Sequence, residues 1–326
     1  MPTLRTIAVY LGLALLLTQF HGEVVNWGTR QHKRLHRHVR ILEHRGDAPW
    51  GYRLLVPYTA EALRSAQAGA LPDTLPPPKK SKKLSVPLER AYLTLRFTFF
   101  FGLFVGFHAW LRRWVDDASA FGGTTLLAAL HGPAFANYWF QPASALDFAL
   151  WTAAGVAVQR SADKWVPLLL LVGALNRETS VFIVLIYAAL RWGTLPTGAL
   201  AARVVGLGVI WALPQAAIRT WVGPLAWAGN GSTPMEYLTA NLTHPDWLSY
   251  AAFFWGVLWI VPALAWKRTP PGLRRVLLVL LPYVVLQFLF GRIREVRLFL
   301  PLALALIPIG LLWLRDATPD AHPETP

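Results

Sequence analysis

Apolar residues recur along this 326-residue chain in ten blocks of roughly 12 to 20 residues, with short polar or charged segments between them. A lipid bilayer offers no hydrogen-bond partner to backbone N–H and C=O groups, so blocks of this kind cross it as helices. Charged residues make up only 15% of the chain, against about 25% in an ordinary soluble domain. The sequence therefore predicts an all-α, polytopic integral membrane protein, a single membrane domain over residues 1–326. It excludes a soluble enzyme, a disordered chain and a disulfide scaffold.

About ten transmembrane helices are expected from these blocks, and one pair of blocks decides the topology. Residues 164–191 form either one span with Arg177 and Glu178 at mid-membrane or a hairpin with these charges at its tip. The hairpin places most arginines and lysines of the short loops on the side of the N-terminus, as the positive-inside rule requires. We therefore expect the hairpin, with both termini cytoplasmic and residues 315–326 as a cytoplasmic tail. The expected blocks are 6–22, 91–111, 118–136, 143–159, 164–176, 179–191, 199–218, 247–266, 273–290 and 297–314.

The first loop, residues 21–90, carries 13 Lys and Arg residues against 6 Asp and Glu residues. This topology makes it a long extracytoplasmic loop, and the helical spacing of apolar residues over 52–66 predicts helices that lie at the membrane interface. The whole chain has a net charge of +14. Because no nucleic-acid-binding motif is present, anionic lipid headgroups or a phosphate-bearing substrate explain this charge better than DNA or RNA.

Two short motifs place several charges at the expected outer face, N-R-E-T (Asn176–Thr179) and G-R-I-R-E-V-R (Gly291–Arg297). Charged groups near membrane depth are costly and are usually paired. We therefore expect Glu178 to pair with Arg177 or with an arginine of the second motif. In that motif Glu295 can neutralise only one arginine, so the excess positive charge suits a phosphate or pyrophosphate. Its expected ligands are Arg292, Arg294 and Arg297, and helical spacing would put Arg294 and Arg297 on one face.

No metal or cofactor is expected. His32, His36 and Glu43 could lie on one side of a helix, but no zinc-binding signature surrounds them, and a solvated basic helix is the simpler interpretation. Carboxylates available outside the membrane for general-base chemistry are few: Glu23, Glu43, Asp47, Asp147 and Glu178. The sequons at Asn230 and Asn241 are short enough to arise by chance.

Three segments carry a resemblance to a known family: Q-H at Gln31 and His32 followed by I-L-E-H-R-G-D-A-P-W-G-Y-R-L-L-V-P, then N-R-E-T-S, then G-R-I-R-E-V-R-L-F-L-P. With one span, a long outer loop and many short spans, the chain resembles the C-type (GT-C) membrane glycosyltransferases, within a poorly characterised bacterial branch. The resemblance covers about residues 4–314.

This resemblance implies transfer of a sugar, with inversion, from a polyprenyl-phosphate-linked donor to an acceptor at the extracytoplasmic face of a bacterial inner membrane. An outer-loop carboxylate, here Glu23 or Asp47, would act as the base. Basic residues would hold the phosphate, with Arg53, Arg294 and Arg297 in contact with it and Arg177 and Glu178 shaping the site. Gln31 and His32 of the first segment are expected at the substrate.

Two alternatives from other functional classes remain open. A transporter or flippase for a lipid-linked or anionic solute would suit the short, proline-interrupted spans. The other is a membrane protein without catalysis that scaffolds an assembly. An accumulated lipid-linked sugar in a deletion strain would distinguish the glycosyltransferase from both.

Overall fold

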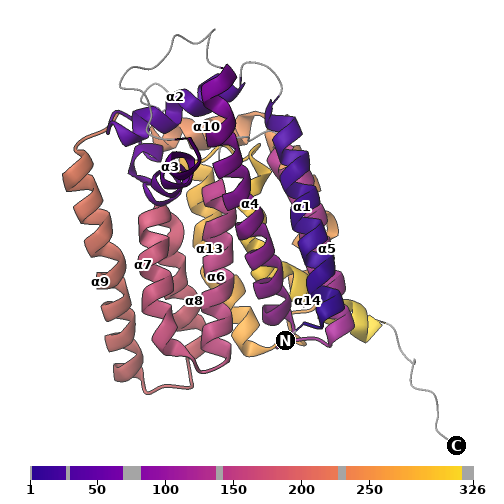
Figure 1. Cartoon of the computed structure of the whole chain (residues 1–326). Coiled ribbons are helices and arrows are strands. Elements are labelled where there is room, and N and C mark those ends of the chain that lie inside the picture. Colours follow the sequence, from indigo (N-terminus) through magenta and orange to yellow (C-terminus); the bar gives the residue numbers. More distant parts are fainter. Residues whose placement is uncertain (1, 27–29, 69–81, 137–141, 227–232, 318–326) are drawn as a thin grey trace, which may run out of the picture.

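A computed structural model describes residues 2–26, 30–68, 82–136, 142–226 and 233–317. These residues form fourteen α-helices joined by short 3-10 turns (Figure 1). The α-helices are α1 Leu4–Asn26, α2 Arg30–Leu42, α3 Leu55–Ala68, α4 Lys82–Leu111, α5 Asp117–Ala136, α6 Pro142–Gln159, α7 Val166–Asn176, α8 Phe182–Arg191, α9 Thr197–Val222, α10 Pro234–Thr243, α11 Pro245–Trp255, α12 Val261–Leu264, α13 Pro271–Phe290 and α14 Ala303–Ala317. The 3-10 turns are η1 Trp50–Tyr52, η2 Asp163–Trp165, η3 Glu178–Val181, η4 Gly256–Trp259 and η5 Val296–Leu302.

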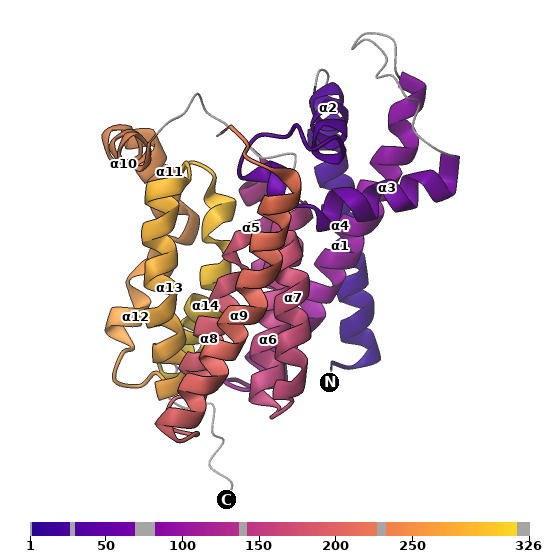
Figure 2. The ribbon, with the colours of Figure 1, turned by 90° about the vertical axis from the view of Figure 1, so that its left-hand side faces the viewer.

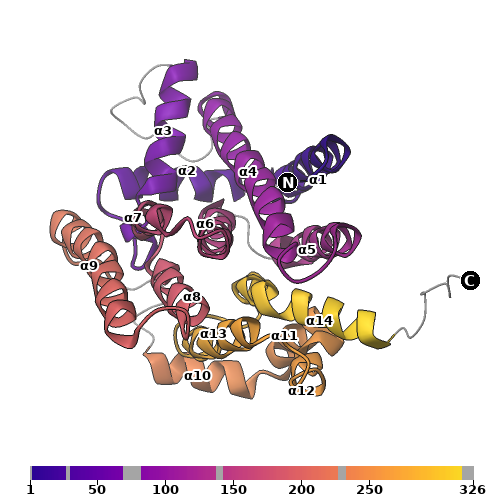
Figure 3. The ribbon, with the colours of Figure 1, turned by 90° about the horizontal axis from the view of Figure 1, so that it is seen from below.

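The long helices run side by side in a bundle with two different ends. Helices α2, α3 and α10 lie across one end, which we call the loop end (Figures 1 and 2). The start of α1 and the end of α14 lie at the other, which we call the terminal end. Viewed from the terminal end, α6 lies inside the bundle, where it packs against α4, α7 and α8 (Figure 3).

Six helical segments are long and apolar enough to cross a membrane, which makes the chain a multi-pass membrane protein by length and composition. They are Leu4–His21, Val86–Leu111, Thr197–Val222, Pro245–Leu264, Pro271–Phe290 and Val296–Arg315. The other four expected blocks also contain helices, but α7 and α8 have only 11 and 10 residues. The all-α prediction agrees with the described residues, whereas the count of ten spans stays a prediction.

These apolar segments differ in how deeply they lie in the protein. Of the residues in the most apolar stretch of each segment, 89% are buried in Val296–Arg315 but only 17% in Thr197–Val222. Helix α14 with η5 therefore belongs to the core, and α9 lies at the periphery. Val205, Val209 and Leu213 of α9 are exposed, as expected for side chains that face lipid.

The chain reverses between α7 and α8, as the hairpin interpretation expects. Arg177, which follows α7, has an extended backbone (φ −158°, ψ 148°) that ends the helix. Arg191 is the last residue of α8, and its Nε donates a hydrogen bond of 3.0 Å to Asp163, which lies just before α7. The far ends of the two helices therefore lie together, and Arg177 and Glu178 lie at the tip of a hairpin.

The basic first loop packs against the bundle through a buried polar network. His38 of α2 contacts the hydroxyl of Tyr92 in α4 at 3.0 Å and the carboxylate of Glu61 in α3 at 3.1 Å. Arg64 donates to both oxygens of the same carboxylate, at 2.8 and 2.7 Å. Helix α3 coincides with the interfacial helix expected over 52–66, and this network holds α2 and α3 at the loop end.

Candidate functional site

A cavity of about 560 Å³ opens at the loop end, where segments that are distant in the sequence meet. Its wall comes from η1 and the residues beside it, the tip of the α7–α8 hairpin, the end of α9, α10, and the chain from the end of α13 into η5. We call it the arginine cavity. Its charged lining residues are Arg53, Arg177, Glu178, Arg219, Arg292, Glu295 and Arg297.

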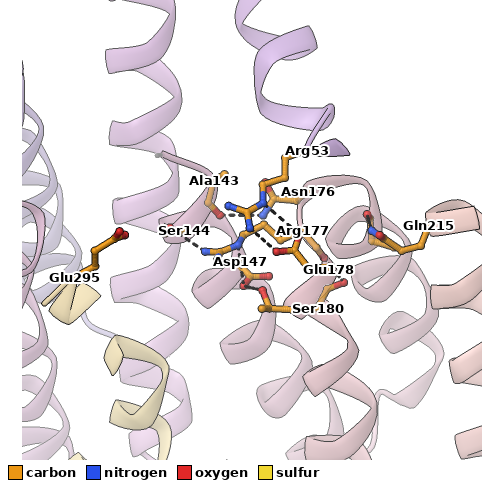
Figure 4. Close-up of polar contacts among 12 residues, drawn as sticks. Arg53, Ala143, Ser144, Asp147, Asn176, Arg177, Glu178, Ser180, Gln215 and Glu295 are labelled. Carbon is orange, nitrogen blue, oxygen red and sulfur yellow. Dashed lines mark hydrogen bonds and ion pairs between the residues drawn. The ribbon is translucent and has the colours of Figure 1, made fainter. Parts of the chain in front are cut away.

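Arg53 and Glu178 form a two-pronged ion pair in this wall (Figure 4). Arg53 Nε lies 3.2 Å from Glu178 Oε2, and Arg53 Nη2 donates to Oε1. Burial by itself would raise the pKa of Glu178, but the charges of Arg53 and Arg177 outweigh it and hold the pKa at about 2. The predicted ion pair is present, but the predicted partner was wrong. Glu178 binds an arginine 125 residues away in the first loop.

Local contacts fix the position of Arg53. The preceding residue, Tyr52, donates its hydroxyl to Gly223 O and accepts from Leu225 N, both at 3.1 Å. Ala48 N also donates to Ala226 O at 2.8 Å. These three contacts hold the turn η1 against the end of α9, so that Arg53 reaches the hairpin tip.

Ser144 of α6 joins two arginines of the cavity. Its hydroxyl oxygen accepts from Arg177 Nη1 at 2.9 Å and from Arg297 Nη1 at 2.8 Å. Arg297 Nη2 also donates to Glu295 at 2.6 Å. Two guanidinium groups around one neutral oxygen concentrate positive charge, and an anion is the natural complement. No sequence pattern pointed to Ser144, because a serine at the start of an apolar block has no distinguishing neighbours.

Asp147 lies beneath Arg177 and balances part of this charge. Its Oδ2 accepts from the Thr179 hydroxyl at 2.7 Å and lies 4.0 Å from Arg177 Nε. Its Oδ1 is buried without a hydrogen-bond partner among the described residues. Asp147 was among the carboxylates considered for base chemistry. Its burial in the wall suits the positioning of Arg177 better than contact with a substrate.

Arg294 and Arg297 point in different directions. Arg297 is buried at Ser144, whereas Arg294 is exposed and lies over the Trp247 ring, 5.1 Å from its centre. The expected shared helical face was wrong, because the chain between Gly291 and Glu295 forms turns and then enters the 3-10 turn η5. Arg292, by contrast, lines the cavity, as does Glu295.

Asn241 of α10 fixes this turn. Its amide donates to Phe288 O and Gly291 O, both at 2.8 Å, and its Oδ1 accepts from Ile293 N at 3.1 Å. The side chain is completely buried. The sequon at this position is therefore a structural contact that orients the arginine-bearing segment, and its amide is not accessible for glycosylation.

Replacing Asn241 with alanine should lower the free energy of unfolding by about 2 kcal/mol or more, because it leaves backbone groups unpaired. Thermal unfolding in detergent measures this. Thr243→Ala is the matched control: it destroys the same sequon, but Thr243 is exposed and bonds only to Thr239 of its own helix. Equal effects of the two substitutions would contradict the structural role of Asn241.

The two candidate bases are Asp47 and Glu23. Asp47 is half-exposed and accepts from Arg40 Nη2 at 3.0 Å, and the next two residues, Ala48 and Pro49, line the cavity. Asp47 itself is not among the lining residues. The side chain of Glu23 lies outside the described residues, and so do the side chains of Gln31 and His32.

Arg219 is a cavity residue that the sequence interpretation did not select. Its guanidinium lies over the Tyr52 ring at 5.4 Å, and its Nη1 donates to Gln215 Oε1 at 3.0 Å. Its position near the end of an apolar block, beside Trp221, was the available signal.

Comparison of the chain with protein-family models, curated proteins and solved structures finds no match.

Proposed function

We propose that the protein is a membrane glycosyltransferase with a C-type (GT-C) architecture. It would move a sugar from a polyprenyl-phosphate-linked donor to an acceptor at the extracytoplasmic face. The observation that carries the proposal is the composition of the arginine cavity. Five arginines line it against two glutamates, and an excess of positive charge remains for an anionic ligand even when the buried carboxylate of Asp147 beneath Arg177 is counted.

A lipid-linked phosphate matches both chemical parts of the cavity wall. Guanidinium groups bind phosphate oxygens in two-pronged geometry. The same wall contains Leu286 and Phe290 of α13 and Leu298 of η5, an apolar surface suited to the first units of a prenyl chain. A free sugar phosphate has no hydrocarbon chain that could pack against that surface. The gathering of the charges at one end of the bundle, away from its middle, favours a transferase over a transporter.

Asp47 is the described carboxylate that best suits the base, because its own ion pair with Arg40 is more than a third exposed on both sides and therefore weak. Glu178 and Glu295, the carboxylates of the cavity wall, are held by Arg53 and Arg297. A base would remove the acceptor hydroxyl proton while that oxygen attacks the anomeric carbon. The bond from that carbon to the phosphate then breaks on the opposite side, and the arginines stabilise the leaving phosphate. Glu23 is the second candidate for this base.

Asp47→Asn should reduce transfer by about 10²-fold or more, the range for losing a general base. Glu43→Gln is the matched control, since Glu43 is an exposed carboxylate four residues away that pairs with Arg45. Lipid extracts from a deletion strain measure the activity. The donor should accumulate, and the Glu43 variant but not the Asp47 variant should clear it. If Glu23→Gln blocks clearance and Asp47→Asn does not, Glu23 is the base. A deletion strain that accumulates no lipid-linked sugar contradicts the transferase itself.

Ten spans with both termini in the cytoplasm would place the arginine cavity outside the bacterial inner membrane. The chain contains no cysteine, so single cysteines introduced at Ser161, Thr197 and Pro271 report on the terminal end. We expect these three to be labelled only after the membrane is permeabilised. A cysteine at Glu236, an exposed residue of α10 at the loop end, should be labelled in intact cells. Labelling of Pro271 in intact cells would contradict this orientation.

A further inference from the structure

A second cavity, of about 400 Å³, lies at the terminal end, far from the arginine cavity along α9. Helix α9 packs there against α7 and α8. The cavity floor is apolar and consists of Val166, Leu207 and Ile210 with Pro167 and Gly206. Its polar lining is confined to Asp163, Lys164, Tyr187 and Arg203. We call this cavity the α9 groove.

The charges of the α9 groove leave positive charge at its mouth. Arg191 donates to both carboxylate oxygens of Asp163, and the Tyr187 hydroxyl donates to it at 3.0 Å. Arg203 is a looser neighbour: its Nη1 lies 3.3 Å from Asp163 and donates to the Tyr187 hydroxyl at 3.1 Å, and its side chain is 51% exposed. Because Arg191 already neutralises Asp163, the charges of Arg203 and Lys164 are available to an anion.

The groove leads from this charged mouth along the surface of a helix that faces lipid. Arg203, Gly206, Leu207 and Ile210 follow the i, i+3, i+4, i+7 spacing, so they form one stripe of α9. A Cβ placed on Gly206 would meet no other atom within 4 Å, so the glycine leaves open space in the stripe. Trp165 and Trp192 are exposed at the same end, as in the aromatic belt at a membrane interface.

We propose that the α9 groove binds one anionic phospholipid, with its phosphate between Arg203 and Lys164 and an acyl chain over Gly206, Leu207 and Ile210. Charge alone would admit any soluble phosphate. The apolar floor on a peripheral, apolar helix selects a molecule that carries both an anionic head and a hydrocarbon chain. The proposal depends on α9 crossing a membrane and is independent of the proposed glycosyltransferase activity.

Native mass spectrometry of the full-length protein, released from nanodiscs of phosphatidylcholine with or without phosphatidylglycerol, tests this proposal. We expect the wild type to retain one phosphatidylglycerol in preference to phosphatidylcholine. Arg203→Gln should reduce that retention at least tenfold, and Arg203→Lys should keep most of it because the charge remains. Gly206→Leu should also reduce it, since a side chain there starts in open space of the groove, where a Cβ would meet no other atom within 4 Å.

Matched controls separate a built site from general surface charge. Gly208→Leu makes the same change two residues along α9, where a Cβ also meets no other atom, but outside the groove lining. Arg160→Gln removes an exposed positive charge at the same end. Both should retain the lipid as the wild type does. Equal loss in Arg160→Gln and Arg203→Gln would overturn the site, as would displacement of the lipid by water-soluble glycerol phosphate.

Discussion

Replacing Arg53 with methionine should abolish transfer and lower the free energy of unfolding by about 3 kcal/mol. Breaking a buried ion pair on one side leaves a charge without compensation and costs about 3–5 kcal/mol. We expect the lower end of that range, because the side chain of Glu178 is still 31% exposed, although that of Arg53 is only 9% exposed. Thermal unfolding in detergent and clearance of the lipid-linked donor measure the two effects.

A double variant distinguishes a structural role of this pair from a functional one. Arg53→Met with Glu178→Leu removes both charges, so much of the lost stability should return. The proposed activity should stay absent, because the cavity loses one of its proposed phosphate ligands. Return of both stability and activity would show that the role of this pair is structural alone. Arg40→Met is a control for stability alone, because Asp47 is the proposed base: the Arg40–Asp47 pair is more than a third exposed on both sides and should contribute at most about 1 kcal/mol.

The same substitution should have an effect that depends on pH. The pKa of Glu178 is about 2 in the folded protein against an ordinary value of 4.5. The stability it contributes is therefore complete above pH 4.5 and is lost as the pH falls through 2. The difference in unfolding temperature between wild type and Arg53→Met should shrink over that interval. A constant difference would show that Arg53 does not set the ionisation of Glu178.

Much of the architecture could be predicted because it depends on local pattern. Apolar blocks predict helices at nearly the right places, since a helix satisfies its own backbone wherever lipid or core surrounds it. The reversal at Arg177 and Glu178 could be predicted from the distribution of Lys and Arg over the short loops, which favoured a hairpin over a single span through these charges. Parity of the helices then brings the charged motifs to one end, which is why Arg177, Glu178, Arg292, Glu295 and Arg297 line a common cavity.

The specific contacts could not be predicted, because periodicity says nothing about which distant loops meet. Arg53 reaches Glu178 because Tyr52 bonds to the backbone at the end of α9, and no local sequence pattern predicts that contact. Arg294 was predicted to lie on a helical face, but the chain forms no helix there. Asn241 instead donates hydrogen bonds to the carbonyl oxygens of Phe288 and Gly291 just before it. Tertiary hydrogen bonds decided both cases.

Arg297→Lys should lose most of the affinity for the proposed donor phosphate although it keeps the charge. Arg297 uses one nitrogen on Ser144 at 2.8 Å and another on Glu295 at 2.6 Å, a planar arrangement that a single ammonium group cannot reproduce. Truncation to alanine should weaken binding by about 2 kcal/mol or more, the range for one partner of a buried charge pair. Binding of polyprenyl phosphate, followed as the rise in unfolding temperature with ligand concentration, measures this.

Arg294→Lys and Arg294→Ala are the matched controls for the two substitutions of Arg297. Arg294 carries the same charge three residues earlier, but it is exposed over Trp247 and outside the cavity lining. A general attraction of the protein for anions would make the two positions equivalent, and an anchor at the membrane surface would make lysine as good as arginine at both. A phosphate ligand predicts a strong effect at Arg297 and almost none at Arg294. Equal losses at the two positions, or full affinity in Arg297→Lys, would show that Arg297 does not bind the phosphate.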